Sequence, residues 1–317
     1  MALTVLSVAY PFAPVGRDAV GGAEQVLAAI DGALVDAGHR SIVVGARGSA
    51  TRGELVATEA PHGPLDDATS ARVRAAHARA VARAVERHRP DVVHLHGVDF
   101  DAYLPPPGPP TLVTLHLPPT YYRAGALRPA RPRTYLHAVS NTQRAAFPPD
   151  VELLPTIPNG VDVASFRVAR KRRYALALGR ICPEKGFHLA LDAAKRAGVP
   201  LVVGGAVFDY EAHRRHYEDD IAPRLDAARR FLGPLAFSRK RRLLSAARCL
   251  LAPSLVQETS SLVTMEALAS GTPVIAFRSG ALAEIVEDGV TGFLVRDVDE
   301  MARAIGRAGE IDPRACR

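Results

Sequence analysis

The strongest constraint on the fold is the order in which short apolar strands and helix patterns alternate along the chain. The first half predicts strands at residues 3–8, 41–44, 91–95, 111–115, 135–139 and 151–154, with helices at 23–37 and 69–88. The pattern starts again with strands at 174–178, 200–203, 230–232 and 249–252 and helices at 184–197, 240–247 and 298–309. Short apolar strands separated by helices are typical of parallel sheets covered on both faces. We therefore predict an α/β protein with two doubly wound halves.

A turn-rich segment separates these halves. Residues 157–166, IPNGVDVASF, contain Pro158, Asn159 and Gly160, which are typical of a connector between domains. A chain of 317 residues is also too long for one ordinary core. We place the domains at residues 1–160 and 161–317.

The charge balance indicates an anionic ligand or an anionic membrane surface. The chain has 40 Lys plus Arg against 33 Asp plus Glu, and its net charge is +7. We expect the basic runs at 170–173 and 239–242, and the arginine-rich helix at 71–89, to be solvated faces. The absence of Trp and of interleaved aromatic residues argues against nucleic-acid binding, whereas peripheral contact with an acidic membrane stays open.

The N-terminus and the cysteines indicate the compartment. No apolar run is long enough to cross a bilayer, and MALTVLSVAYPF lacks the basic start and cleavage site of a signal peptide. We therefore expect a cytoplasmic protein. Cys182, Cys249 and Cys316 have no metal-type spacing, so reduced thiols are expected rather than disulfides or a zinc site.

Residues 257–276, QETSSLVTMEALASGTPVIA, predict a ligand site around a short helix at 262–269 that ends at Gly271. Glu258 lies in the turn before the helix, where its carboxylate can accept hydrogen bonds from sugar hydroxyls. Glu266 lies about one turn inside and can reach a second diol. The free N–H groups at the helix start, which belong to Ser261, Leu262 and Val263, form a seat for phosphate. The spacing predicts a nucleotide sugar laid along this segment.

A second segment, LGRICPEKGF at residues 178–187, supplies two cations. Arg180 follows a predicted strand, and Lys185 precedes a predicted helix. Arginine offers a fork of donors and lysine a compact charge, so both can converge on one diphosphate and stabilise a departing nucleoside diphosphate.

Four further segments place polar or flexible residues on or after predicted strands. Gly21 and Gly22 form the turn before the first helix, where the backbone can approach a phosphate. His116 follows the strand at 111–115, a position where open α/β sheets present ligand groups. We expect His94 and His96, on one strand, to be structural. Ser140 and Asn141 are expected to start a helix, with capping as their role.

Together, these segments resemble the retaining glycosyltransferases with the GT-B fold. The glutamates at 258 and 266 match the E-x7-E signature, residues 179–186 match GR-x-x-x-x-K-G, and residues 21–24 resemble the GG-x-E loop. The chain departs from the family at Thr259, Ser260 and Ser261, which replace Gly, an aromatic residue and Gly.

The resemblance implies two Rossmann-like domains that face across a cleft, with the acceptor side in the N-terminal domain and the donor site in the C-terminal domain. It implies same-face transfer of a hexose from a nucleotide sugar, with UDP-sugars favoured and GDP-sugars open. The acceptor would be a small molecule, a glycan or a lipid-linked alcohol. Glu258 and His116 would act near the anomeric centre. Gly21, Gly22, Arg180, Lys185 and residues 261–263 would contact the substrate, and Glu266 would hold the ribose.

Other interpretations stay open. The triplets at Asp99 and Asp101 and at Asp297 and Asp299 could hold a metal ion, but the paired cations make one unnecessary, so we expect no metal or cofactor. A nucleotide-sugar epimerase or sugar phosphorylase on the same fold would need groups that we cannot identify. A non-catalytic nucleotide-sugar-binding protein is favoured by the altered turn and by the lack of the terminal helix with which relatives usually continue.

Overall fold

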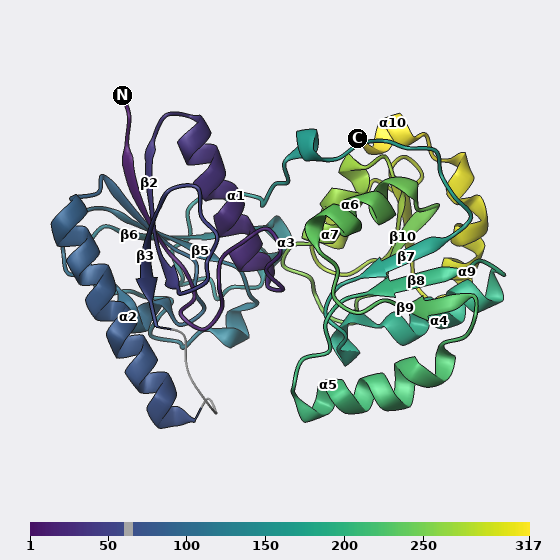
Figure 1. Ribbon diagram of the computed structural model, residues 1–317, viewed down its shortest axis with the longest axis horizontal. Coiled ribbons are helices and arrows are strands. Elements are labelled where there is room, and N and C mark those ends of the chain that lie inside the picture. Colours follow the sequence, from purple (N-terminus) through teal and green to yellow (C-terminus); the bar gives the residue numbers. More distant parts are fainter. Residues whose placement is uncertain (60–65) are drawn as a thin grey trace. The chain divides into compact units, whose positions relative to one another are not determined.

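The computed structural model describes residues 1–59 and 66–317 of the chain (Figure 1). Its internal contacts divide the chain into an N-terminal unit, Met1–Asn159, and a C-terminal unit, Gly160–Arg317. The division falls inside the turn-rich segment at residues 157–166, which contains only a short 3₁₀ turn at Val163–Ser165.

The N-terminal unit is built on a parallel sheet with the strand order β3-β2-β1-β4-β5-β6. The strands are β1 (Thr4–Val8), β2 (Arg40–Ala46), β3 (Glu54–Thr58), β4 (Val92–Leu95), β5 (Thr111–Leu115) and β6 (Thr134–Ala138). The helices are α1 (Gly22–Asp36), α2 (Asp67–His88) and α3 (Asn141–Ala145). In Figure 1, α1 and α2 lie on opposite sides of the sheet.

The C-terminal unit has a second parallel sheet, with the order β12-β11-β10-β7-β8-β9. Its strands are β7 (Ala175–Leu178), β8 (Leu201–Gly204), β9 (Arg229–Phe231), β10 (Cys249–Ala252), β11 (Val274–Phe277) and β12 (Gly292–Val295). Its helices are α4 (Phe187–Arg196), α5 (Glu211–Arg215), α6 (Phe237–Ala246), α7 (Leu262–Ala269), α8 (Leu282–Ile285), α9 (Val298–Arg307) and α10 (Pro313–Cys316). Counted from its own first strand, this sheet repeats the order of the first one, which is the order of Rossmann-type folds. The predicted α/β class is confirmed.

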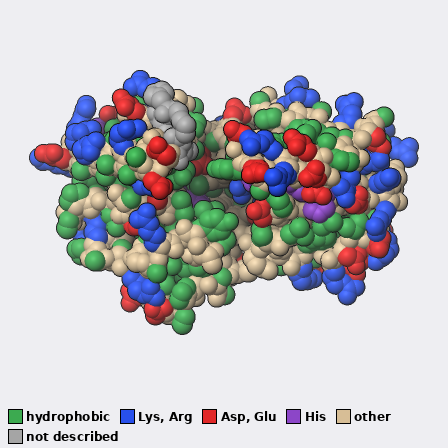
Figure 2. Space-filling model, turned by 90° about the horizontal axis from the view of Figure 1, so that it is seen from below, with side chains coloured by type: hydrophobic (Ala, Val, Ile, Leu, Met, Phe, Trp, Pro, Cys, Tyr) green, Lys and Arg blue, Asp and Glu red, His purple; other side chains and the backbone are tan. Residues whose placement is uncertain are grey.

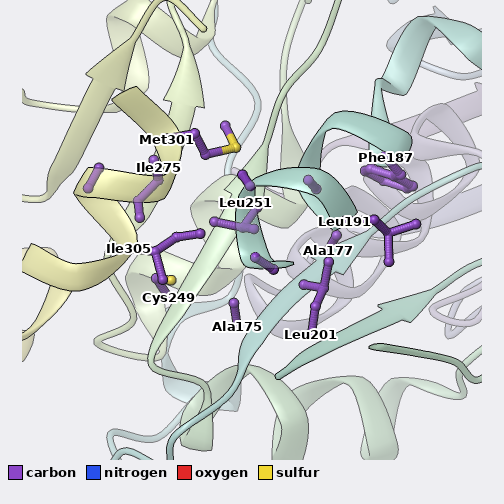
Figure 3. Packing of buried hydrophobic residues seen from close by; sticks show 14 of the residues in the cluster. Ala175, Ala177, Phe187, Leu191, Leu201, Cys249, Leu251, Ile275, Met301 and Ile305 are labelled. Atoms are coloured by element: carbon purple, nitrogen blue, oxygen red, sulfur yellow. The ribbon is translucent and has the colours of Figure 1, made fainter. Parts of the chain in front are cut away.

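Alternate residues of β7, β8, β10, β11 and β12 enter different cores. On β7, Ala175 and Ala177 pack with residues of α4 and α9, whereas Leu176 and Leu178 pack with residues of α6 and α7. Figure 3 shows the first of these cores, in which Met301 and Ile305 lie near strand residues. Successive side chains of a strand point to opposite faces, so burial on both faces explains the near-continuous apolar sequence of these strands.

The predicted strand at 151–154 is wrong. This segment pairs with β6 only through the bonds from Leu154 N to Leu136 O and from Ile157 N to Ala138 O. Pro148, Pro149 and Pro155 interrupt the N–H donors that a ladder would need. The sequence analysis also missed β3 and β12, whose apolar runs are only three residues long. It missed the helix formed by α5 with the π-helical turn His216–Ile221 because the residues of that helix are largely polar.

Basic side chains are interspersed with acidic ones on the face shown in Figure 2. The prediction of solvated basic runs is wrong at Lys171, because its ammonium donates to Ser245 O at 2.9 Å, Ser270 O at 3.2 Å and Thr272 Oγ1 at 2.5 Å. Burial lowers the pKa of Lys171 to about 8. This lysine joins the C-terminal ends of α6 and α7. Among the described residues, no helix is both long enough and apolar enough to span a membrane.

Candidate active site

The functional segments of the C-terminal unit follow β7 and β10, the two strands at which the order of the sheet reverses. Open α/β sheets bind ligands outside the carboxyl ends of the strands at this point. Residues 179–187 follow β7, and residues 253–261 follow β10. The topology therefore brings the two cations and the two glutamates of the sequence analysis into one region.

The loop after β7 is held in place by close backbone contacts. Gly186 has a φ of +63°, and a Cβ there would lie 2.2 Å from Pro253 O. Leu255 N also donates to Glu184 O at 2.8 Å. Only glycine allows this approach of the two loops. The contacts fix Lys185, which ends a 3₁₀ turn at Pro183–Lys185.

The two predicted cations of this loop have different surroundings. Lys185 is half-buried, and its Nζ lies 2.6 Å from Glu258 Oε1. Arg180 is exposed at the end of β7 and makes no ion pair within the part of the chain that the structure describes. Lys185 thus has a carboxylate partner already, whereas the Arg180 guanidinium is open to an anionic ligand.

The turn that carries Glu258 rests on a backbone support. Ala281 N donates to Glu258 O at 2.7 Å, and Gly280 has a φ of +56°. A Cβ at Gly280 would lie 2.3 Å from Glu258 O, so a side chain cannot be added without moving the turn. The support fixes the backbone of Glu258 and leaves its carboxylate directed at Lys185.

The predicted helix at 262–269 is confirmed as α7. Its N-cap residue, Ser261, does not cap the helix, because its hydroxyl bonds to Thr264 Oγ1 at 2.8 Å. The first N–H groups of a helix have no partner inside the helix, so those of Leu262 and Val263 point out of its N-terminal end. A helix start of this kind favours an anion, so the phosphate site at residues 261–263 stays a prediction.

Glu266 is buried within α7, with 5% exposure, and its carboxylate lies 2.6 Å from Lys240 Nζ. Burial raises the pKa of Glu266, and the nearby Lys240 opposes this shift. The prediction that residues 239–242 form a solvated face is therefore wrong at Lys240, which lies on α6 where it packs against α7. It is also wrong at Arg241, which donates to Ser165 O.

In the N-terminal unit, Gly21 is the N-cap of α1 and Gly22 is its first residue. The side chain of Glu24 folds back toward this helix start, since a Cβ on Gly21 would lie 1.9 Å from Glu24 Oε2. Glu24 is buried, and burial raises its pKa. Gly21 thus makes room for a carboxylate of its own helix, which competes with an external anion at this position.

His116 follows β5, and its Nε2 lies 3.0 Å from Nδ1 of the buried His96 on the adjacent strand exit. Burial, and then the nearby His137, lower the pKa of His116 to about 3. The pKa of His96 is also far below its ordinary value because of burial. At neutral pH both rings are uncharged, so His116 can give or accept a hydrogen bond but cannot act as a cation.

His94 belongs to the same cluster. Its Nε2 lies 2.7 Å from Thr114 Oγ1, which lies 2.7 Å from His137 Nε2. Burial lowers the pKa of His94 to about 3. These contacts agree with a structural role for His94, whereas His96 contacts the predicted site residue His116 directly. Ser140 Oγ accepts from Gln143 N at 3.1 Å and caps α3, as predicted.

The aspartates of the two D-x-D triplets have protein partners. Asp99 accepts from Arg74 Nε at 2.6 Å and from Tyr103 Oη at 2.9 Å. Asp101 lies 3.4 Å from Arg123 Nη1. In the second triplet, Asp297 caps α9 and Asp299 pairs with Arg196. All four carboxylates therefore have roles in the fold.

Sequence reasoning missed three residues that shape the site. Lys240 pairs with Glu266, Gly280 supports Glu258, and Gly205 allows β8 to approach the loop after β7, since a Cβ there would lie 1.7 Å from Gly179 O. Two of these residues had a signal in the sequence: Gly205 forms a glycine pair with Gly204 at the end of β8, and Gly280 lies just before α8. Lys240 had no such signal, because its partner is 26 residues away.

Comparison with known proteins gives matches for both units. Residues 20–165 match the model of the Glycosyltransferase Family 4, and residues 172–310 match that of the Glycosyl transferases group 1. A phosphatidyl-myo-inositol mannosyltransferase of Mycolicibacterium smegmatis is 36% identical over 164 residues, which cover 47% of this chain and 41% of that protein. A glycogen synthase of Mycobacterium tuberculosis is 33% identical over 185 residues, covering 54% and 43%. The matched region thus spans less than half the length of these relatives.

Solved structures match nearly the whole chain. AviGT4, a glycosyltransferase involved in avilamycin A biosynthesis, has a TM-score of 0.71 at 26% identity and covers 99% of this chain, which covers 92% of it. The sucrose-phosphate synthase of Thermosynechococcus elongatus has a TM-score of 0.78 at 19% identity, with 99% and 91% coverage. Anabaena HepE in complex with UDP and glucose has a TM-score of 0.73 at 22% identity, with 97% and 90% coverage. The last two likenesses concern the fold alone.

Proposed function

Since the chain belongs to the group 1 glycosyltransferases with the GT-B fold, we propose that it transfers a hexose from a nucleoside-diphosphate sugar to an acceptor hydroxyl with retention at the anomeric carbon. The observation that carries this proposal is the 2.6 Å pair of Lys185 and Glu258 beside the open start of α7, at the reversal point of the second sheet.

The donor is assigned to the C-terminal unit. Arg180, Lys185 and the N–H groups of residues 261–263 bind the diphosphate, and their positive charge stabilises the negative charge that develops on the leaving group. Lys185 then shares its ammonium between the diphosphate and Glu258. Retention follows from same-face attack, in which the leaving phosphate takes the proton of the acceptor hydroxyl.

The two glutamates have separate roles. Glu258 accepts hydrogen bonds from the transferred sugar and stabilises positive character at its ring. Glu266, kept in position by Lys240, accepts from the ribose hydroxyls. Because the four D-x-D aspartates bind protein groups and two cations are available for the phosphate, we propose that the donor needs no metal ion held by these aspartates.

The acceptor is assigned to the N-terminal unit, where His116 and the turn at Gly21 and Gly22 are the groups proposed to contact substrate. A neutral imidazole suits hydrogen bonding to sugar hydroxyls. The acceptor class is a small molecule, a glycan or a lipid-linked alcohol. We expect UDP-sugars to be preferred over GDP-sugars.

A donor screen tests this function. UDP- and GDP-sugars are added singly, and the thermal shift identifies those that bind the folded chain. Donors that bind are then incubated with acceptors, and NMR gives the anomeric configuration of the product. An inverted product would exclude retention but leave transfer intact. Donor binding without transfer to any acceptor and without slow hydrolysis would instead indicate a nucleotide-sugar-binding protein.

A further inference from the structure

A cluster of three metal-ligand side chains lies in the C-terminal unit, outside the groups assigned to the donor. Ligand atoms of Cys182, Glu184 and His213 all lie within 4.8 Å of one another. Cys182 and Glu184 belong to the loop after β7, and His213 belongs to α5. The cluster thus joins two segments that are about 30 residues apart in sequence.

His213 is the member that points to a ligand. The residue is 9% exposed, and its Nδ1 is buried without a hydrogen-bond partner among the described residues. The ring is held by its neighbours, edge-on to Tyr210 at 5.2 Å and stacked on Phe208 at 6.0 Å between centroids. A buried polar nitrogen without a partner is costly, so its position beside a thiol and a carboxylate calls for a bound group.

We propose that Cys182, Glu184 and His213 form a binding site for a single Zn²⁺-like transition-metal ion. One sulfur, one imidazole nitrogen and one carboxylate oxygen are the ligand types that zinc takes, whereas Mg²⁺ and Ca²⁺ prefer sites made of oxygen alone. Tetrahedral ligands at zinc are about 3.5 Å apart, so small side-chain adjustments close the cluster. Water completes the four-coordinate shell.

The charges of such a site balance. The Cys182 thiol releases its proton to water when the ion binds, and the thiolate and the Glu184 carboxylate together neutralise the two positive charges. Cys182 is buried and Glu184 is exposed, so the ion enters from the solvent side along the carboxylate. The neutral His213 imidazole supplies the third ligand through Nδ1.

The site has a consequence for the loop after β7. Its two ligands from this loop lie between Arg180 and Lys185 in sequence, so an ion would tie the backbone that carries both cations to α5. We place the ion in a positioning role. It is distinct from a metal ion that binds the donor phosphates through aspartates.

Cobalt substitution tests the site without an activity assay. Tag-free full-length chain, freed of metal with a chelator, is titrated with Co²⁺. We expect one equivalent to produce a thiolate-to-cobalt charge-transfer band, and Zn²⁺ to remove it by competition. Glu184→Gln, an exposed change that spares the core, and His213→Gln should each weaken Co²⁺ binding by more than about tenfold. Cys182→Ser should abolish the charge-transfer band.

Matched controls are a cysteine and a histidine of the same unit. Cys316→Ser and His188→Gln should keep the wild-type spectrum and affinity, because these buried or half-buried residues lie outside the cluster. Wild-type chain without a charge-transfer band, or a band that persists in Cys182→Ser, would overturn the proposal. If Cys182→Ser loses the band but still binds the donor, the metal site is supported and is separate from the donor site of the proposed glycosyl transfer.

Discussion

The two units have the same strand order but place different chemistry at the carboxyl ends of their strands. In the C-terminal unit this edge carries ion pairs, Lys185 with Glu258 and Lys240 with Glu266. In the N-terminal unit it carries buried, uncharged imidazoles, with His116 bonded to His96. The same strand order therefore presents charged side-chain pairs in one unit and neutral hydrogen-bonding rings in the other, and the side chains at the strand ends make the difference.

The largest effect is expected from Glu258→Gln. The change removes the negative charge proposed to stabilise the sugar in the transition state, so kcat should fall by about 10²–10³ with little change in the KM for donor. Steady-state kinetics with the donor from the screen checks this. The exposed Glu287→Gln is the matched control and should be silent. An equal kinetic defect in Glu258→Gln and Glu266→Gln would contradict the division of roles between the two glutamates.

The next effect concerns the cations. Arg180→Ala and Lys185→Ala should each lower donor affinity by about one to two powers of ten, because a hydrogen bond to a charged group contributes about 1.5–3 kcal/mol. Calorimetric titration measures the loss, and the exposed Arg170→Ala serves as control. Wild-type affinity in both variants would exclude the assignment of these cations to the phosphates. The C-terminal unit would then bind anions no better than the N-terminal unit.

Glu266→Gln sharpens the comparison through stability. The glutamine keeps a hydrogen bond but leaves the half-buried Lys240 without its counter-ion, so the free energy of unfolding should fall by about 1–3 kcal/mol. Urea denaturation checks this, together with a higher KM for donor. The double variant Glu266→Gln and Lys240→Gln should recover part of the stability. If the loss of stability in the double variant equals or exceeds the sum of the losses in the two single variants, the pair does not act as a unit.

Acidification should separate the units. Folding lowers the pKa of His94 and of His116 from 6.5 to about 3. Their contribution to the free energy of unfolding is complete above pH 6.5. Below pH 6.5 the unfolded chain binds their protons first, so this contribution is lost as pH falls toward 3. Each such histidine changes stability by at most about 1.4 kcal/mol per pH unit in this window. The raised pKa of Glu266 acts in the opposite direction. As pH falls, the folded state binds the proton of Glu266 before the unfolded state does, so this group raises the free energy of unfolding.

Hydrogen exchange on the full chain can follow this difference. Between pH 7 and pH 5, amides of β4 and β5 should lose more protection than those of β7 and β10, after correction for intrinsic exchange rates. Equal losses in both units would show that the histidine cluster does not set the acid sensitivity of the N-terminal unit.

The smallest effect is expected from Asp101→Asn. Asp101 pairs with the exposed Arg123, and exposed ion pairs are worth about 0–1 kcal/mol, so stability should hardly change. Turnover should also stay at the wild-type level with or without added Mg²⁺ or Mn²⁺. Turnover that depends on these ions and is lost in the variant would instead make the N-terminal unit a metal-phosphate site.

The sequence predicted those parts of the molecule in which local pattern and tertiary environment agree. The helix at 262–269 has its turn before it and Gly271 after it, and α7 has the predicted bounds. β3 and β12 were missed because their apolar runs of three residues are too short to identify a strand, which forms by pairing with β2 and β11 respectively. The roles of Glu258 and Glu266 stay predictions. Lys185 was predicted as a cation of the site, but its pairing with Glu258 and that of Lys240 with Glu266 were not. Long-range ion pairs leave no periodic pattern in the sequence.

The support of Glu258 by Gly280 has a consequence for how this site can be altered by engineering. The loop at residues 279–281 holds the turn through backbone atoms, by way of Ala281 N and the bare Cα of Gly280. Ser279 Oγ also donates to Val256 O of the same turn, whereas the neighbouring Arg278 is exposed. A library should therefore tolerate wide variation at exposed neighbours such as Arg278 and Ala283, keep small residues at the buried Ser279 and Ala281, and return almost only glycine at residue 280. Donor preference can then be redesigned nearby without shifting the glutamate.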